Sequence, residues 1–124
     1  MNQIETWSLP PFKAGQSIIM DITVMDDDNP LQLVNAWAAC TFRDRYGGTE
    51  FFTVDSDGSG IVISPLTGLI HIEISPSQTL LLNSTGMQTK GVFDVKLVIP
   101  PFADYPVFDG RWVCYPSSTI VEPS

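Results

Sequence analysis

Residues 61–74 read IVISPLTGLIHIEI, and this stretch decides the fold. Two apolar runs flank the sequence Ser64-Pro65-Leu66-Thr67-Gly68, in which proline and glycine favour a chain reversal. In the second run an isoleucine occupies every second position, the period of two that is typical of a half-buried strand. We therefore predict a β-hairpin whose core-facing residues include Ile70, Ile72 and Ile74.

The same alternation recurs on both sides of this hairpin. Residues 91–99 place four apolar side chains on one face: Phe93, Val95, Leu97 and Ile99. Residues 16–25 do the same with Ile18, Met20, Ile22 and Val24. Residues 33–44 contain LVNAWAAC, which a helix would also suit, but Thr41-Phe42 continues the alternation and favours a strand. That strand would turn inward Val34, Ala36, Ala38, Cys40 and Phe42. Residues 50–54 and 110–115 complete the set of strands.

One helical turn interrupts this series of strands. Ser75-Pro76 has the composition of a helix start, and the leucines at 80–82 are followed by Asn83 to Gly86, which end the helix near residues 77–82. Seven or eight short strands separated by turn residues are typical of an immunoglobulin-like antiparallel β-sandwich. We predict an all-β fold of this kind, a single domain over residues 1–124 with proline-rich termini.

Charge and hydropathy limit the classes of partner. The 124 residues carry a formal net charge of −8, which repels a phosphate backbone, so we expect no nucleic-acid partner. The first residues lack the basic and apolar regions of a signal peptide, and no apolar run approaches the ~20 residues that span a bilayer. We expect a soluble protein without a membrane partner.

Cys40 and Cys114 form neither a C-x-x-C pair nor a disulfide-dense framework. We interpret both as small buried apolar residues and expect them to be unbridged, although the spacing does not forbid a bridge.

No catalytic motif is evident. His71 is the sole histidine, and it lies on the predicted exposed face of its strand without a nucleophile or carboxylate at a spacing that signals a triad. The phosphate-binding, dinucleotide-binding and nucleophile-elbow glycine motifs are absent from the sequence. We predict a protein that is not an enzyme, with no catalytic residues and no cofactor.

Two acidic segments resemble cation sites only superficially. Residues 55–60, DSDGSG, match the start of an EF-hand loop, but the twelfth position is Leu66 where a glutamate is needed. Asp26-Asp27-Asp28 precedes Asn29-Pro30 and is typical of a solvated polar turn. We predict turns at both places and no metal site.

The order of these landmarks resembles a known class of protein. Residues 12–16, FKAGQ, precede an apolar strand; residues 57–63, DGSGIVI, lead into residues 67–74, TGLIHIEI. Residues 76–80, PSQTL, follow, then residues 91–97, GVFDVKL, and finally residues 109–116, DGRWVCYP. This layout resembles small virion proteins of tailed bacteriophages with an immunoglobulin-like β-sandwich, including the N-terminal domain of baseplate upper proteins.

The resemblance implies a non-catalytic structural protein of a bacteriophage virion. It would be an accessory or adaptor module that contacts other tail or baseplate proteins, present in several copies in a symmetric assembly and assembled in the host cytoplasm. Two alternatives stay open: a capsid decoration protein of the same virion class, and a carbohydrate-binding module that stacks sugars on Trp7, Trp37 or Trp112.

The proline-rich segments are the predicted contact surface. Residues 7–12 and 113–124 and a predicted loop over residues 100–108 are nearly uncharged and lack strict alternation. The alternative is that they fold back over the ends of the sandwich as part of its core. The candidate interface residues are Trp7, Pro10, Pro11, Phe12, Pro100, Pro101, Phe102, Tyr105 and Phe108.

Overall fold

The computed structural model describes residues 5–26, 28–30, 32–58, 60–83, 85–100 and 104–116, with the backbone alone at 5–8, 26 and 104–108. In chain order the elements are β1 (Glu5–Ser8), β2 (Phe12–Lys13), β3 (Ile18–Thr23), β4 (Met25–Asp26), β5 (Asn29–Pro30), β6 (Trp37–Arg43), β7 (Glu50–Asp55), β8 (Ile61–Ser64), β9 (Leu69–Ile74), α1 (Pro76–Leu80), β10 (Thr89–Val98) and β11 (Asp104–Tyr115). These described residues make an all-β fold with one short helix, as the alternation predicts.

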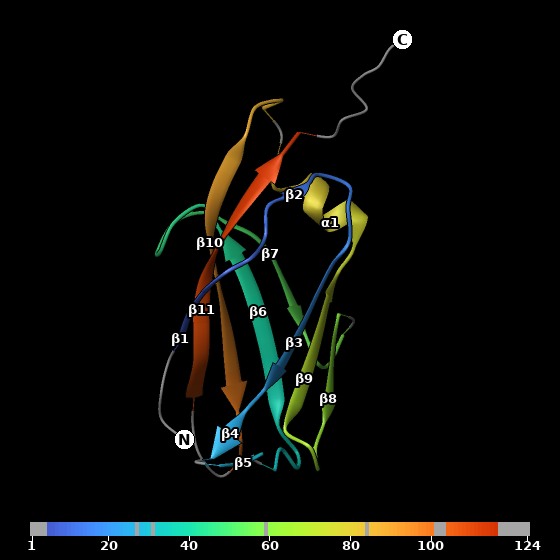
Figure 1. The fold of residues 1–124 in the computed structure, drawn as a ribbon, viewed down its shortest axis with the longest axis vertical. Coiled ribbons are helices and arrows are strands. Elements are labelled where there is room, and N and C mark those ends of the chain that lie inside the picture. Colours follow the sequence, from blue (N-terminus) through green and yellow to red (C-terminus); the bar gives the residue numbers. More distant parts are fainter. Residues whose placement is uncertain are drawn as a thin grey trace.

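The strands form two main sheets. Sheet A has the order β1-β11-β10-β6-β7, with β2 also pairing with β11, and sheet B has the order β3-β9-β8. Figure 1 shows the long strands running along the long axis of the molecule, with α1 and β2 at one end and the β4–β5 hairpin at the other. The sheets lie on opposite sides of one hydrophobic cluster and make a β-sandwich.

The predicted core faces are confirmed. Ile70, Ile72 and Ile74 of sheet B are fully buried, and the inward residues of sheet A that share their cluster are also buried: Phe93, Val95 and Leu97 of β10 and Ala38, Cys40 and Phe42 of β6. Burying one face of each sheet is what stabilises both, since isolated small sheets are marginal in water.

Two predicted strands are shorter than their apolar pattern. The strand expected over residues 33–44 begins only at Trp37, because residues 34–35 turn and Asn35 adopts a left-handed φ of 60°. Val34, expected inside, is therefore exposed. Residues 16–25 give β3 and then the short β4, which pairs with β5, so Asp26, Asn29 and Pro30 of the turn predicted over residues 26–30 lie in two short strands.

The predicted loop over residues 100–108 is wrong for residues 104–108, which belong to β11. Pro106 made a loop look favourable, because proline cannot donate to a strand ladder. The structure tolerates it at an irregularity: β10 and β11 shift register between Val95 and Lys96, and Pro106 lies opposite Lys96. A bulge is one of the few places in a sheet where proline fits.

The N-terminal segment joins sheet A. β1 pairs in parallel with β11, with Glu5 opposite Phe108, and β2 continues along the same strand, with Phe12 opposite Cys114. Parallel pairing of segments about a hundred residues apart leaves no local sequence signal. Within the described part of the chain, no helix is long and apolar enough to cross a membrane.

Candidate interaction surface

Four large apolar side chains are exposed on α1, on the loop after it and at the end of β11 where β2 pairs. They are 43% to 72% exposed and come from the helix, the loop after it and the end of β11: Leu80, Leu81, Met87 and Tyr115. We call these four residues the apolar end surface. Exposed apolar groups that share one end of a small protein mark a contact site more often than scattered ones do.

Polar contacts beneath this surface hold it in place. The buried hydroxyl of Thr79 donates to the carbonyl of Gln16 and accepts from the amide of Gly15, both at 2.9 Å. The Asn83 side-chain amide donates to the carbonyls of Met87 at 2.7 Å and Cys114 at 3.1 Å. The helix, the following loop and β11 are thus joined to each other, so the apolar end surface is preorganised.

A capping box starts the helix. The Ser75 hydroxyl accepts from the amide of Gln78 at 3.2 Å, and the Gln78 side-chain oxygen accepts from the amide of Ser75 at 2.9 Å. Pro76 stands at the start of the helix, where its missing N–H costs nothing. The predicted helical turn is confirmed, with its start at Pro76.

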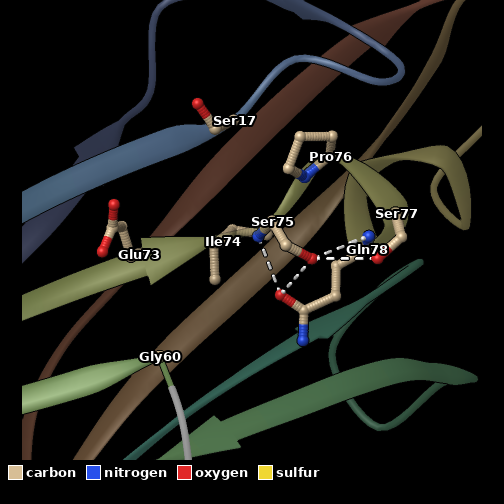
Figure 2. Close-up of a pocket in the computed structure, with 8 residues that line it drawn as sticks. All are labelled: Ser17, Gly60, Glu73, Ile74, Ser75, Pro76, Ser77 and Gln78. Atoms are coloured by element: carbon tan, nitrogen blue, oxygen red, sulfur yellow. Dashed lines mark hydrogen bonds between the residues drawn. The ribbon is translucent and has the colours of Figure 1, made fainter.

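The cap also lines a hollow of about 400 Å³, whose walls include Ser17, Gly60 and Glu73 (Figure 2). Figure 2 shows the Gln78 side chain folded back toward Ser75, with its amide nitrogen directed away from that residue. Two of the polar atoms that line the hollow, the Ser75 hydroxyl and the Gln78 oxygen, already bond each other's backbone in the capping box.

The predicted interface residues have different environments. Pro10, Pro11 and Pro100 are exposed, whereas Phe12 is buried in the core cluster together with Leu9. At Phe12 the alternative holds, because its side chain serves the fold. Trp7, Tyr105 and Phe108 lie in β1 and β11, where the backbone alone is described, and Pro101, Phe102 and residues 117–124 lie outside the described residues.

The run of three leucines at residues 80–82 is a sequence signal for exposed apolar side chains at this place. A helix of five residues buries one narrow face, so three consecutive leucines cannot all be inside. Leu82 is buried, and Leu80 and Leu81 are left in solvent. Met87 and Tyr115 join them only through the tertiary structure, which no local pattern reveals.

His71 has carboxylate partners that the sequence spacing did not indicate. Its Nδ1 lies 2.6 Å from an oxygen of Asp21 on the neighbouring strand, and its Nε2 lies 3.8 Å from an oxygen of Glu73. The two carboxylates face opposite ring nitrogens, so the three side chains do not converge on a point where a metal could sit. The pairing fixes the ring in the middle of sheet B.

In the two acidic turns, one aspartate bonds the backbone of its own turn and another is exposed to solvent. In the DSDGSG segment, one oxygen of Asp55 accepts from the amides of Asp57 at 3.0 Å and Gly58 at 2.7 Å, the bonding of an Asx turn. Asp28 is exposed in the β4–β5 turn. Within the described ranges no group of three histidine, cysteine, aspartate or glutamate residues is arranged to hold a metal.

Trp112 is not a stacking platform. Its ring is buried, its Nε1 donates to the carbonyls of Val92 at 3.1 Å and Arg43 at 3.2 Å, and Phe51 meets it edge-on at 5.9 Å. Trp37 is partly exposed in β6. The buried ring removes one of three candidates for sugar stacking.

The cysteines are buried, as predicted, and both are free. Cys40 lies opposite Val95 of β10 and Cys114 opposite Thr89 of the same strand. Six residues of strand separate these positions by about 20 Å, far beyond the ~7 Å that a disulfide tolerates between Cα atoms. Burial raises the pKa of the Cys114 thiol to about 11 and, with the charge of Asp94 adding to it, raises that of Cys40 further.

Comparison with known proteins adds no assignment to this geometry: no protein-family model matches the chain, and no curated protein matches it by sequence.

Proposed function

We propose that this protein is a non-catalytic immunoglobulin-like module that binds other proteins within a larger assembly. The observation that carries the proposal is the apolar end surface, which exposes Leu80, Leu81, Met87 and Tyr115 on a preorganised support. Leaving such side chains in water is unfavourable by roughly 25 cal/mol per Å² of apolar surface, and contact with a partner removes that cost.

The strand order supports the immunoglobulin-like part of the proposal. Sheet B, β3-β9-β8, corresponds to strands B-E-D of that fold, and β11-β10-β6-β7 corresponds to G-F-C-C′ of its variable type. The fold departs from the pattern at the N-terminus, where β1 and β2 pair with β11 and, among the described strands, none of the A type pairs with β3.

The assembly that we propose is a bacteriophage virion, with the protein as an accessory or adaptor of the tail or baseplate in several copies. The support for the virion is the resemblance of the sequence landmarks together with this strand order. A non-catalytic role is supported by the contacts of the polar groups that could otherwise take part in chemistry. The Ser75 hydroxyl, the Gln78 oxygen and both ring nitrogens of His71 each contact another residue of the fold.

The proposal is tested on purified particles from the host that carries the gene. Immunogold electron microscopy with antibody against this protein should label one substructure of the particle. A double variant, Leu81→Ser with Met87→Ser, should keep its fold by circular dichroism and lose occupancy. The matched control, Val34→Ser with Leu66→Ser, removes two equally exposed apolar side chains elsewhere and should retain it.

Particles without label would contradict the virion assignment. Normal occupancy of the Leu81→Ser, Met87→Ser variant would contradict the apolar end surface as the site of contact, whatever the assembly is.

A further inference from the structure

Sheet B ends at β3 on one side among the residues that the structure describes. β3 pairs with β9 alone, from Ile18 opposite Ile74 to Thr23 opposite Leu69. Its other edge faces outward with backbone groups that another strand can pair with.

This edge is longer than that of β8 and more regular than that of β7. β8 has four residues and is bounded by Gly60 and Pro65, and β7 has a register shift next to its first residue, Glu50. β3 runs for six residues, IIMDIT, without proline, glycine or a bulge, and it is rich in β-branched side chains. Regular, weakly charged edges of this kind are the ones that accept a further strand.

The hydrogen-bond pattern fixes which residues of β3 would bond a new strand. The amide of Val24 donates to the carbonyl of Gly68 at 2.8 Å, which continues the β3–β9 register. In an antiparallel ladder the bonded residues alternate, so residues 18, 20 and 22 direct their backbone groups toward β9. Residues 19, 21 and 23 direct theirs outward.

We propose that β3 pairs antiparallel with β3 of a second copy of this chain, about a two-fold axis at Met20, to give a continuous six-stranded sheet. In this register Ile19 of each copy lies opposite Asp21 of the other, and these are the residues whose backbone groups point outward. Ile18 lies opposite Ile22 on the inner face. A two-fold axis at Asp21 would instead bring two like carboxylates directly opposite each other, which is unfavourable.

The side chains suit this register. Ile19 is 57% exposed on the outer face and would be covered by the second copy. Asp21 is held by His71 at 2.6 Å, so its carboxylate is turned along its own sheet toward β9. The two-fold register thus covers Ile19 and sets no like charges directly opposite each other along the two copies of β3.

Sedimentation of the full chain over a concentration series tests the proposal. The wild type should show a reversible monomer–dimer equilibrium. Ile19→Asp should shift it to monomer, because it sets a new carboxylate against Asp21 of the second copy at two symmetric positions. The matched control is Val62→Asp, the same kind of change at a 64% exposed position of β8 on the same outer face, and it should dimerise like the wild type.

The register has its own test. In the double variant Ile19→Cys, Asp21→Cys, the two new cysteines of different copies lie about 5.5 Å apart between Cα atoms, which a disulfide can span. In each single variant the equivalent cysteines lie about 9 Å apart, which it cannot. Oxidation should therefore cross-link the double variant and neither single variant, while the buried Cys40 and Cys114 stay unreactive.

A monomer at every concentration of the wild type would overturn the proposal. A dimer that Ile19→Asp leaves intact, or that cross-links equally through a single cysteine, would overturn it in favour of another surface. These results are independent of whether the apolar end surface binds a virion.

Discussion

Gly91 lies under the indole of Trp112, its partner across β10 and β11. A Cβ at this position would come within 2.6 Å of the indole Cε2 and would also clash with the carbonyl oxygen of Arg43. The backbone of β6 cannot move aside without breaking its ladder, so the glycine is what allows the ring to sit against the sheet.

Gly91→Ala should therefore destabilise the fold by about 1–3 kcal/mol, as other overpacking changes do. The free energy of unfolding in urea measures this cost, and Lys90→Ala, an exposed neighbour, is the control. Equal stability of the two variants would show that the ring has another resting place.

The pKa of the Asp94 carboxyl is shifted in opposite directions by its neighbours. Partial burial raises the pKa of its carboxyl, the Arg43 guanidinium 3.3 Å away lowers it, and the charge of Asp109 on β11 raises it again. Because the pKa in the folded state lies above the ordinary value, ionised Asp94 reduces stability at neutral pH. That reduction disappears as the pH falls through the folded pKa.

Asp109→Asn should thus lower the pKa of Asp94, since it removes one of the two influences that raise it. Carboxyl chemical shifts in an NMR titration report this value directly. Arg43→Gln should move it in the opposite direction, and a pKa that neither change affects would mean that burial alone sets it.

The thiols give a further prediction at this scale. Cys40 and Cys114 should react with a thiol reagent only after unfolding, because both are fully buried and their raised pKa values keep the reactive thiolate scarce. Titration of the unfolded, unreduced protein should count two thiols per chain. A count of zero would reveal a bridge that the registers of β6 and β11 do not allow.

At the scale of elements, sequence patterns predicted best where burial is strictly periodic. In β9, of six residues, and β10, of ten residues, the alternation identified the inward side chains. Their register is strongly determined, because a slip by one residue would expose every one of these side chains. The parallel pairing of β1 with β11, the Asp21–His71 contact and the strand around Pro106 could not be predicted, since each depends on registers between distant segments.

The short helix shows how a local signal and its consequence separate. Ser75, Pro76 and Gln78 together specify where α1 starts, and the structure places its first residue there. The same signal does not reveal that Leu80 and Leu81 remain exposed, because this depends on how the helix is tied to Gly15 and Gln16 through Thr79.

Removing the cap should weaken this end of the molecule. Ser75→Ala deletes the acceptor of the Gln78 amide and should cost about 0.5–2 kcal/mol, with Ser77→Ala as a control that keeps the capping bonds. Hydrogen exchange of the amides at 78–82 should accelerate in the first variant only. Unchanged exchange would mean that the Thr79 contacts hold the helix without its cap.

At the scale of the whole molecule, each sheet depends on the other. Sheet B has three strands, and its inner residues Ile70, Ile72 and Ile74 are buried only because sheet A covers them. Sheet A buries its own inner face by the same contact. Neither sheet has an independent core, so we expect the two to unfold in one transition.

Ile72→Ala tests this dependence from sheet B. The change should cost about 2–5 kcal/mol, because it opens a cavity in a fully buried site.

All three tryptophans lie in strands of sheet A, namely Trp7 in β1, Trp37 in β6 and Trp112 in β11, while His71 lies in sheet B. Tryptophan fluorescence therefore reports the sheet without the substitution, and the His71 ring protons in NMR report the sheet that carries it. Both signals should shift to the same lower urea midpoint. If the fluorescence midpoint stayed at its wild-type value while the histidine midpoint fell, the sheets would be separate folding units, and a β3–β3 dimer would then stabilise sheet B alone.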